Sequence, residues 1–136
     1  MARTGIKEMV LDSSAIVAMH LKEQGCERLF ERITQAGVVL VGAPTVFESA
    51  MVLASRMGTD ARSLLAAFFR RKGVSVVPFT EEHFHAATEA FLRFGKGRHR
   101  AALNFGDCMA YAIAAVAGLP LLYTGNDFAQ TDIPAA

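Results

Sequence analysis

The chain alternates short apolar runs with longer segments in which apolar residues recur every three or four positions. The apolar runs cover residues 9–11, 38–41, 74–77 and 121–123. A short apolar run bounded by turn residues is typical of a strand buried in a parallel sheet. The pattern therefore predicts four strands, with a short fifth strand around residues 131–133 as a further option.

Segments with helical periodicity separate these runs. The predicted helices cover residues 14–20, 25–35, 44 to the stop at Gly58, 61–71, 80 to about 94, and 104–117. Pro44 suits the first turn of its helix, and Thr80 opens a segment that resembles a capping box. Strands that alternate with helices imply an α/β fold: a three-layer α/β/α domain with a mainly parallel central sheet of four to five strands. We expect residues 1–136 to form this single domain.

Composition narrows the class of protein. Of the 136 residues, 52% are hydrophobic and 20% are charged, which suits a well-buried globular protein. The net charge of +1 gives no overall field that would attract nucleic acid, so any such site has to be a local patch. Cys26 and Cys108 have no CxxC partner, and we expect both to be reduced core thiols of a cytoplasmic protein. The first eight residues contain no apolar signal segment.

Four acidic residues stand at ends of predicted elements. Asp12 follows the first strand, Glu48 lies early in the helix after the second strand, Asp107 lies in the first turn of the last helix, and Asp127 follows the fourth strand. In a parallel sheet all four positions fall at the carboxyl edge, where ligands gather. Clustered carboxylates repel one another unless a cation neutralises them. Oxygen-only ligands favour Mg²⁺ or Mn²⁺, and such an ion typically serves phosphodiester chemistry, as in a nuclease or phosphatase.

Each acid also has a purely structural interpretation. Asp12 could cap the helix that follows it, and Asp107 could complete a capping box with Asn104. Glu48 could complement the positive end of its helix, and Asp127 could be a turn residue. Caps and turns account for many such acids, so only their convergence on one site would favour the chemical interpretation.

Several segments together resemble the PIN domain, and more narrowly the VapC ribonuclease toxins of bacterial type II toxin–antitoxin modules. The segments are VLDSSA at 10–15, PTVFESA at 44–50, LNFGDCMAYA at 103–112, LLYTGNDF at 121–128 and TDI at 131–133. The resemblance implies a Mg²⁺-dependent endoribonuclease, in which Mn²⁺ may substitute, that a cognate VapB-type antitoxin neutralises. It also implies that Asp12, Glu48 and Asp107 form the main metal site and that Asp127 is the fourth catalytic acid.

The chain departs from the family pattern at two positions. Asn126 stands where the family often has an acid, which leaves the fourth ligand open between Asn126 and Asp127. Thr124 replaces a frequent lysine, so one basic contact near the site is absent. Ser13 stands where the family often has threonine and keeps a hydroxyl beside the expected metal, where it could also contact RNA.

The best local basic patch lies directly upstream of the Asp107 helix. It comprises Lys96, Arg98, His99 and Arg100 in one loop, with Arg93 just before them. Lysine and arginine attract RNA phosphates without regard to sequence. We therefore predict that this loop positions the RNA backbone, while a solvated loop is the alternative.

The sequence also suggests a partner surface and two competing functions. Phe68, Phe69, Met51 and Met57 are candidates for a homodimer or antitoxin surface. A catalytically inactive PIN-like binding module, acting only through its antitoxin complex, is the main alternative function. An α/β phosphatase built on Asp12 usually needs a second aspartate two residues later, and Ser14 stands there instead.

Overall fold

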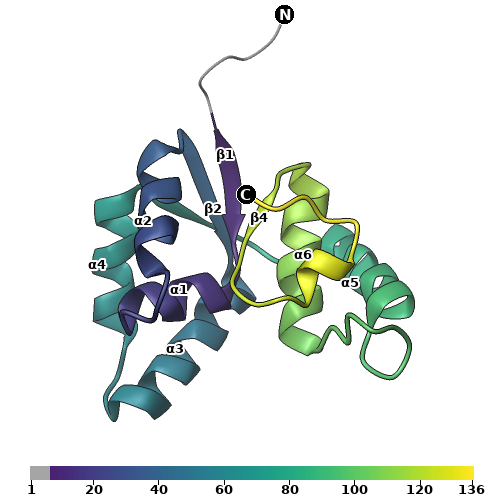
Figure 1. Cartoon of the computed structure of the whole chain (residues 1–136), viewed down its shortest axis with the longest axis horizontal. Helices are drawn as coiled ribbons and strands as arrows, with labels where there is room; N and C mark the ends of the chain where they lie inside the picture. The colour runs from purple at the N-terminus through teal and green to yellow at the C-terminus, as the bar shows by residue number, and fades with distance from the viewer. Residues whose placement is uncertain (1–6) are drawn as a thin grey trace, which may run out of the picture.

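The computed structural model describes residues 7–136, in which four parallel strands form the central sheet (Figure 1). The strands are β1 (Glu8–Leu11), β2 (Val38–Gly42), β3 (Val74–Val77) and β4 (Leu121–Leu122), in the order β3-β2-β1-β4. Val10 of β1 pairs with Leu40 of β2 and with Leu121 of β4. Because every pairing is parallel, the carboxyl ends of the strands share one edge of the sheet.

The helices follow the periodicity of the sequence to within one or two residues. They are α1 (Ser13–His20), α2 (Cys26–Gln35), α3 (Ala43–Met57), α4 (Arg62–Lys72), α5 (Glu81–Phe94) and α6 (Phe105–Ala117), and a 3₁₀ turn η1 (Phe128–Gln130) follows β4. The predicted three-layer α/β/α fold with a parallel sheet is confirmed.

The optional fifth strand around residues 131–133 does not form. The Thr131 side chain accepts from the Ile133 amide and donates to the Phe128 carbonyl, which holds the chain in a turn. The last residues touch β4 only through an isolated bridge between Leu121 and Ala135. The neighbouring Pro134 has no amide proton to extend a ladder, so pairing stops there.

Two apolar clusters cover opposite faces of the sheet. Met9 and Leu11 of β1 point into a cluster with α1, α2, α3 and α4, whereas Val10 points into a cluster with α5 and α6. Figure 1 shows the two groups of helices on either side of the strands. Cys26 and Cys108 are buried and free, as the sequence predicts. Among residues 7–136, no helix is both long and apolar enough to span a bilayer.

Two of the four residues predicted to form a partner surface are buried, so this prediction is wrong for those two. Phe68 and Phe69 are only 2% and 8% exposed, and both belong to the core under α4. Met51 and Met57 are 49% and 44% exposed on α3. An apolar stripe on a helix can be wide enough to bury two consecutive aromatic residues, which explains why both phenylalanines face inward.

Candidate functional site

Asp12 ends β1 and divides its two carboxylate oxygens between different environments. Oδ2 accepts hydrogen bonds from the Ser14 amide at 3.0 Å and the Ser14 hydroxyl at 2.6 Å, and so caps α1. Oδ1 is buried without a hydrogen-bond partner among the described residues, and the whole residue is 3% exposed. Burial raises the pKa of this carboxyl group, and the nearby Glu48 charge raises it further. The capping interpretation is therefore correct for one oxygen and leaves the other oxygen available to a ligand.

The Asp107 carboxylate, at the start of α6, likewise caps a helix and faces the other acids. Its Oδ2 accepts from the Asn104 amide at 3.0 Å, and its own amide donates to Asn104 Oδ1 at 2.9 Å, which completes a capping box. Burial raises the pKa of Asp107 to about 6, with further contributions from the charges of Asp12 and Asp127. The capping box predicted as an alternative is thus present, and the carboxylate still faces the other acids.

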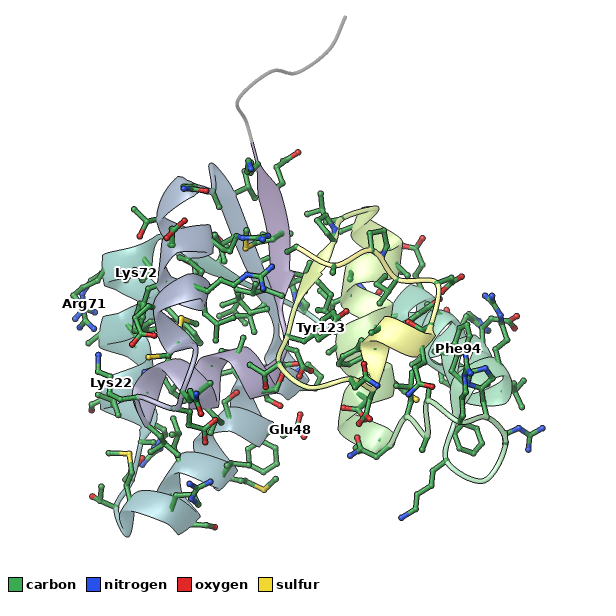
Figure 2. The ribbon with its side chains drawn as sticks, in the orientation of Figure 1. Lys22, Glu48, Arg71, Lys72, Phe94 and Tyr123 are labelled. Carbon is green, nitrogen blue, oxygen red and sulfur yellow. The ribbon has the colours of Figure 1, made fainter. Side chains whose placement is uncertain are left out.

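Glu48 reaches the same place from α3. Its carboxylate lies against Gly106 of α6: a Cβ atom at position 106 would stand 2.6 Å from Oε1 and closer still to Oε2. The Ser13 side chain hydrogen-bonds Glu48, whereas burial, followed by the charge of Asp107, raises the pKa of this carboxyl group. Figure 2 shows Glu48 at the carboxyl end of the sheet, between the two groups of helices. Gly106 is therefore the residue that makes room for the third acid.

Asp127 is the most exposed of the four acids, in the turn between β4 and η1, and its neighbour Asn126 is also exposed. This turn is tied to the start of α1, because the Thr124 amide donates to the Ser14 hydroxyl oxygen at 3.0 Å. Ser14 therefore joins Asp12 to the turn that carries Asp127. This role of Ser14 was not predicted, although the paired serines after Asp12 are a visible signal in the sequence.

The four acids form one electrostatic cluster, here called the acidic site. The pKa of Asp107 responds to Asp12 and Asp127, and the pKa of Glu48 responds to Asp107. Within residues 7–136, no three histidine, cysteine, aspartate or glutamate side chains stand close enough to hold one ion as they are. The donor chemistry nevertheless fits a hard divalent cation. All four side chains offer oxygen, and Oδ1 of Asp12 has no hydrogen-bond partner in the part of the chain that the structure describes. A cation would also relieve the repulsion among the carboxylates.

Part of the basic loop after α5 already makes contacts within the protein. Arg98 donates to the Leu92 carbonyl at 3.3 Å and lies over the Phe91 ring. His99 accepts from the Ala101 amide at 3.0 Å. Lys96 and Arg100 are exposed, so a role of this loop in RNA binding stays a prediction that rests mainly on them.

Arg93 does not extend this patch as the sequence suggested. It forms an ion pair of 3.1 Å with Asp132 of the C-terminal segment. Tyr111 of α6 donates its hydroxyl proton to the same carboxylate, and burial, with this hydrogen bond, raises the pKa of Tyr111 to about 12. Together these residues fasten the C-terminal segment to α5 and α6. Helical periodicity gives no signal for this contact, because the segment's position depends on the tertiary fold.

Comparison with known proteins identifies the family of this chain. The PIN domain model matches residues 9–134. Ribonuclease VapC36 of Mycobacterium tuberculosis is 48% identical over 126 residues, which cover 92% of this chain and 91% of the relative. Ribonuclease VapC of Mycolicibacterium smegmatis is 39% identical over 127 residues, which cover 93% of this chain and 98% of the relative.

Solved structures show the same fold. The crystal structure of Mycobacterium tuberculosis VapC20, a toxin described as cleaving the sarcin-ricin loop, matches with a TM-score of 0.73 and 21% identity, over 94% of this chain and 98% of that one. A toxin–antitoxin complex from Klebsiella pneumoniae matches with a TM-score of 0.67 and 14% identity, over 91% of this chain and 92% of that one. The family match over nearly the whole chain, with the sequence identities above, shows that this chain is a PIN-domain protein of the VapC ribonuclease family.

Proposed function

We propose that this chain is a Mg²⁺-dependent endoribonuclease, the toxic component of a type II toxin–antitoxin pair, and that Mn²⁺ can substitute for Mg²⁺. Its membership among the VapC ribonucleases supports RNA as the substrate and the cytoplasm as the place of action. The observation that carries metal dependence is the buried Oδ1 of Asp12, which has no partner among the described residues and belongs to a carboxylate cluster. A buried carboxylate oxygen without a donor is costly unless a cation or proton joins it.

The proposal assigns a role to each residue of the acidic site. Asp12, Glu48 and Asp107 would hold the cation, and Asp127 would support them from the turn after β4. A cation bound there lowers the pKa of a coordinated water and stabilises the charge that develops on the phosphate. Ser13 would hold the Glu48 carboxylate in place through the hydrogen bond already present.

Substitution of Asp107 by asparagine tests this assignment. The amide oxygen of asparagine can still accept from the Asn104 amide, so the start of α6 should survive while one charge is lost. We expect Asp107→Asn to abolish RNA cleavage and growth arrest. Asp60→Asn is the matched control, because Asp60 also accepts from a backbone amide, that of Arg62, but is exposed. Full cleavage by folded Asp107→Asn, or cleavage that EDTA does not inhibit, would overturn the proposal.

Mn²⁺ titration separates this function from the inactive binding module. An enzyme should show heat of binding and a rise in melting temperature with Mn²⁺, together with cleavage of RNA. A folded protein that shows none of these would favour a module that acts only through its antitoxin complex.

We also propose that a VapB-type antitoxin binds and neutralises this chain, and that the chain forms a homodimer. Family membership supports the antitoxin, and the matching Klebsiella pneumoniae structure is itself a toxin–antitoxin complex. The test is co-expression with the product of any short adjacent gene. We expect co-purification and relief of growth arrest, and light scattering of the isolated chain should give the mass of two copies.

A further inference from the structure

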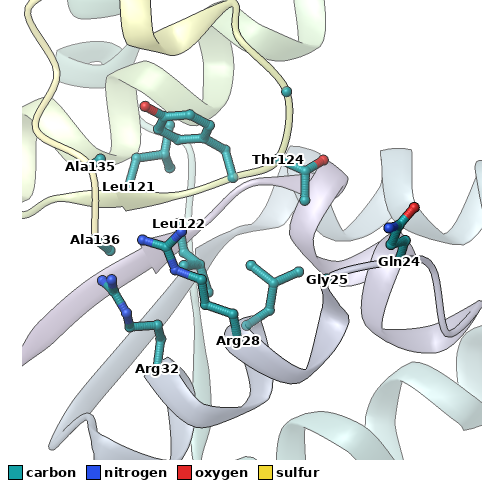
Figure 3. Close-up of a pocket in the computed structure, with 12 residues that line it drawn as sticks. Gln24, Gly25, Arg28, Arg32, Leu121, Leu122, Thr124, Ala135 and Ala136 are labelled. Atoms are coloured by element: carbon teal, nitrogen blue, oxygen red, sulfur yellow. The ribbon is translucent and has the colours of Figure 1, made fainter.

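A pocket of about 420 Å³ lies outside the acidic site, between α2 and the edge strand β4. Arg28 and Arg32 line one wall, and Tyr123, Thr124 and Gly125 line the other. Figure 3 shows both arginine side chains extending from α2 towards β4 and the last residues of the chain. The pocket therefore combines two cations with the backbone of the segment that follows β4.

The part of the chain that the structure describes gives neither arginine an ion pair, although the C-terminal residue Ala136 also lines the pocket. Among residues 7–136, neither forms a hydrogen bond or an ion pair, although Arg32 is half-buried. They stand four residues apart on α2, so their side chains lie on one face about 5–6 Å apart at Cβ. Arg62 and Arg93, in contrast, form ion pairs with Asp60 and Asp132. Two adjacent, unpaired guanidinium groups in one pocket form a site for an anion with several oxygens.

The segment after β4 links the pocket to the acidic site. Thr124 and Gly125 line the pocket, and the Thr124 amide donates to Ser14, whose hydroxyl donates in turn to Asp12. Asp127 follows three residues after Thr124 on the same turn. A polymer anchored by the arginines would therefore lie beside the acids, along the carboxyl edge of the sheet.

We propose that Arg28 and Arg32 bind phosphates of the substrate RNA on the β4 side of the acidic site. This inference rests on the proposed ribonuclease function. Tyr123 is half-buried beside the arginines and offers an aromatic ring on which a base can stack. The exposed Lys96 and Arg100 lie on the α5–α6 side, so the RNA would cross the acidic site between two basic groups.

RNA fits this pocket better than an acidic peptide does. Arginine forks match phosphate oxygens, and the pocket adds an aromatic face and shares Thr124 and Gly125 with the turn that carries Asp127. An acidic segment of a protein partner would make equal use of the arginines, but it has no bases to stack on the Tyr123 ring. Binding of an acidic peptide is therefore the alternative that the test distinguishes from RNA binding.

The test compares the double variant Arg28→Gln/Arg32→Gln with Arg70→Gln/Arg71→Gln, both in the full chain carrying Asp107→Asn to prevent cleavage. Arg70 and Arg71 are exposed at the end of α4, and Figure 2 places Arg71 on the side of the molecule away from Glu48. Both pairs of substitutions change the net charge equally. The probe is a short, fluorescein-labelled single-stranded RNA of mixed sequence, whose binding is followed by anisotropy at several salt concentrations.

The Arg28→Gln/Arg32→Gln variant should bind the RNA at least about tenfold more weakly, and the slope of log K against log salt should fall by about 1.4, since each lost phosphate contact removes about 0.7 for a single strand. The Arg70→Gln/Arg71→Gln variant should change affinity less than twofold. Arg28→Lys/Arg32→Lys should restore most of the slope, because lysine keeps the charge. Melting temperatures check that each variant is folded.

Two outcomes would overturn the inference. Equal RNA affinity of the two glutamine variants would show that the arginines do not contact phosphate. Unchanged RNA affinity together with weaker neutralisation by a co-expressed antitoxin would assign the pocket to a peptide. The parent chain without Asp107→Asn is assayed in parallel for Mg²⁺-dependent cleavage of the same RNA. When either outcome occurs and the parent chain cleaves, only the arginine assignment fails; if the parent chain neither binds nor cleaves the RNA, the proposed function fails as well.

Discussion

Gly106→Ala offers a way to disturb the acidic site without damaging the fold. Gly106 lies in the first turn of α6, and its missing side chain leaves the space that the Glu48 carboxylate occupies. A Cβ atom there would stand 2.6 Å from Oε1 of Glu48. Because ordinary carbon contacts begin near 3.5 Å, the carboxylate must retreat by roughly 1 Å. The carboxylate is the far end of a flexible side chain, so it can move at little cost to packing.

The expected consequence is a stable protein with poor activity. Alanine is favoured over glycine in a helix by up to about 1 kcal/mol, so the free energy of unfolding should stay level or rise. Displacement of a catalytic group by about 1 Å can lower a rate by roughly 10²-fold. We therefore expect Gly106→Ala to lower the initial rate of RNA cleavage about a hundredfold, and to weaken the rise in melting temperature that the proposed Mg²⁺ binding predicts.

A double-mutant cycle with Glu48→Asp isolates the cause. Aspartate is one methylene shorter and withdraws the carboxylate from position 106, so adding Gly106→Ala to Glu48→Asp should cost much less than it costs the parent chain. Initial rates and urea unfolding measured on all four proteins give both quantities. A Gly106→Ala variant that cleaves at the parent rate, or one that loses its rate only because it unfolds, would refute the reasoning.

Three further predictions follow from the same contacts. In EDTA, Asp107→Asn should be more stable than the parent by about 1 kcal/mol at pH 8, after allowance for solvent screening. In the folded parent chain the pKa of Asp107 is about 6, above the ordinary value of 3.8. The protonated carboxyl group therefore stabilises the fold below pH 4, and this stabilisation is lost as the pH rises through 6. Urea unfolding across this range should therefore show the difference vanishing near pH 4. Ser14→Ala should lower the free energy of unfolding by about 1–2 kcal/mol and speed hydrogen exchange of the Thr124 amide, which loses its acceptor; unchanged exchange would contradict the link. Tyr111→Phe should cost about 0.5–1.5 kcal/mol in urea unfolding because the Asp132 carboxylate loses a donor, and an unchanged midpoint would count against that contact.

Much of the fold could be predicted because its signals are local. Apolar runs located the strands, and polar caps located helix starts such as Asn104 and Thr80, which the structure confirms. The error at 131–133 arose because a turn closed by the Thr131 hydroxyl leaves no visible period in the sequence. The two buried phenylalanines of α4 were misplaced because the width of an apolar stripe depends on what packs against it.

The candidate site could be predicted to the level of residues but not of atoms. The edge rule for parallel sheets brought Asp12, Glu48 and Asp107 to one place, and the structure puts them there. It could not say that a single carboxylate caps a helix with one oxygen and leaves the other without a partner. Arg28 and Arg32 escaped notice because their pocket exists only once β4 and the chain end are positioned against α2.

The two carboxylate oxygens of Asp12 have different environments, and this difference has a genetic consequence. One oxygen begins a helix and the other is left to a ligand, and asparagine can supply the first function without the second. On the proposed function, a single-base change from an aspartate codon to an asparagine codon would therefore remove the toxic activity and leave the fold intact. Cells that escape poisoning by this route would keep a harmless copy, still able to occupy the antitoxin and so to alter the balance in any relative that remains armed.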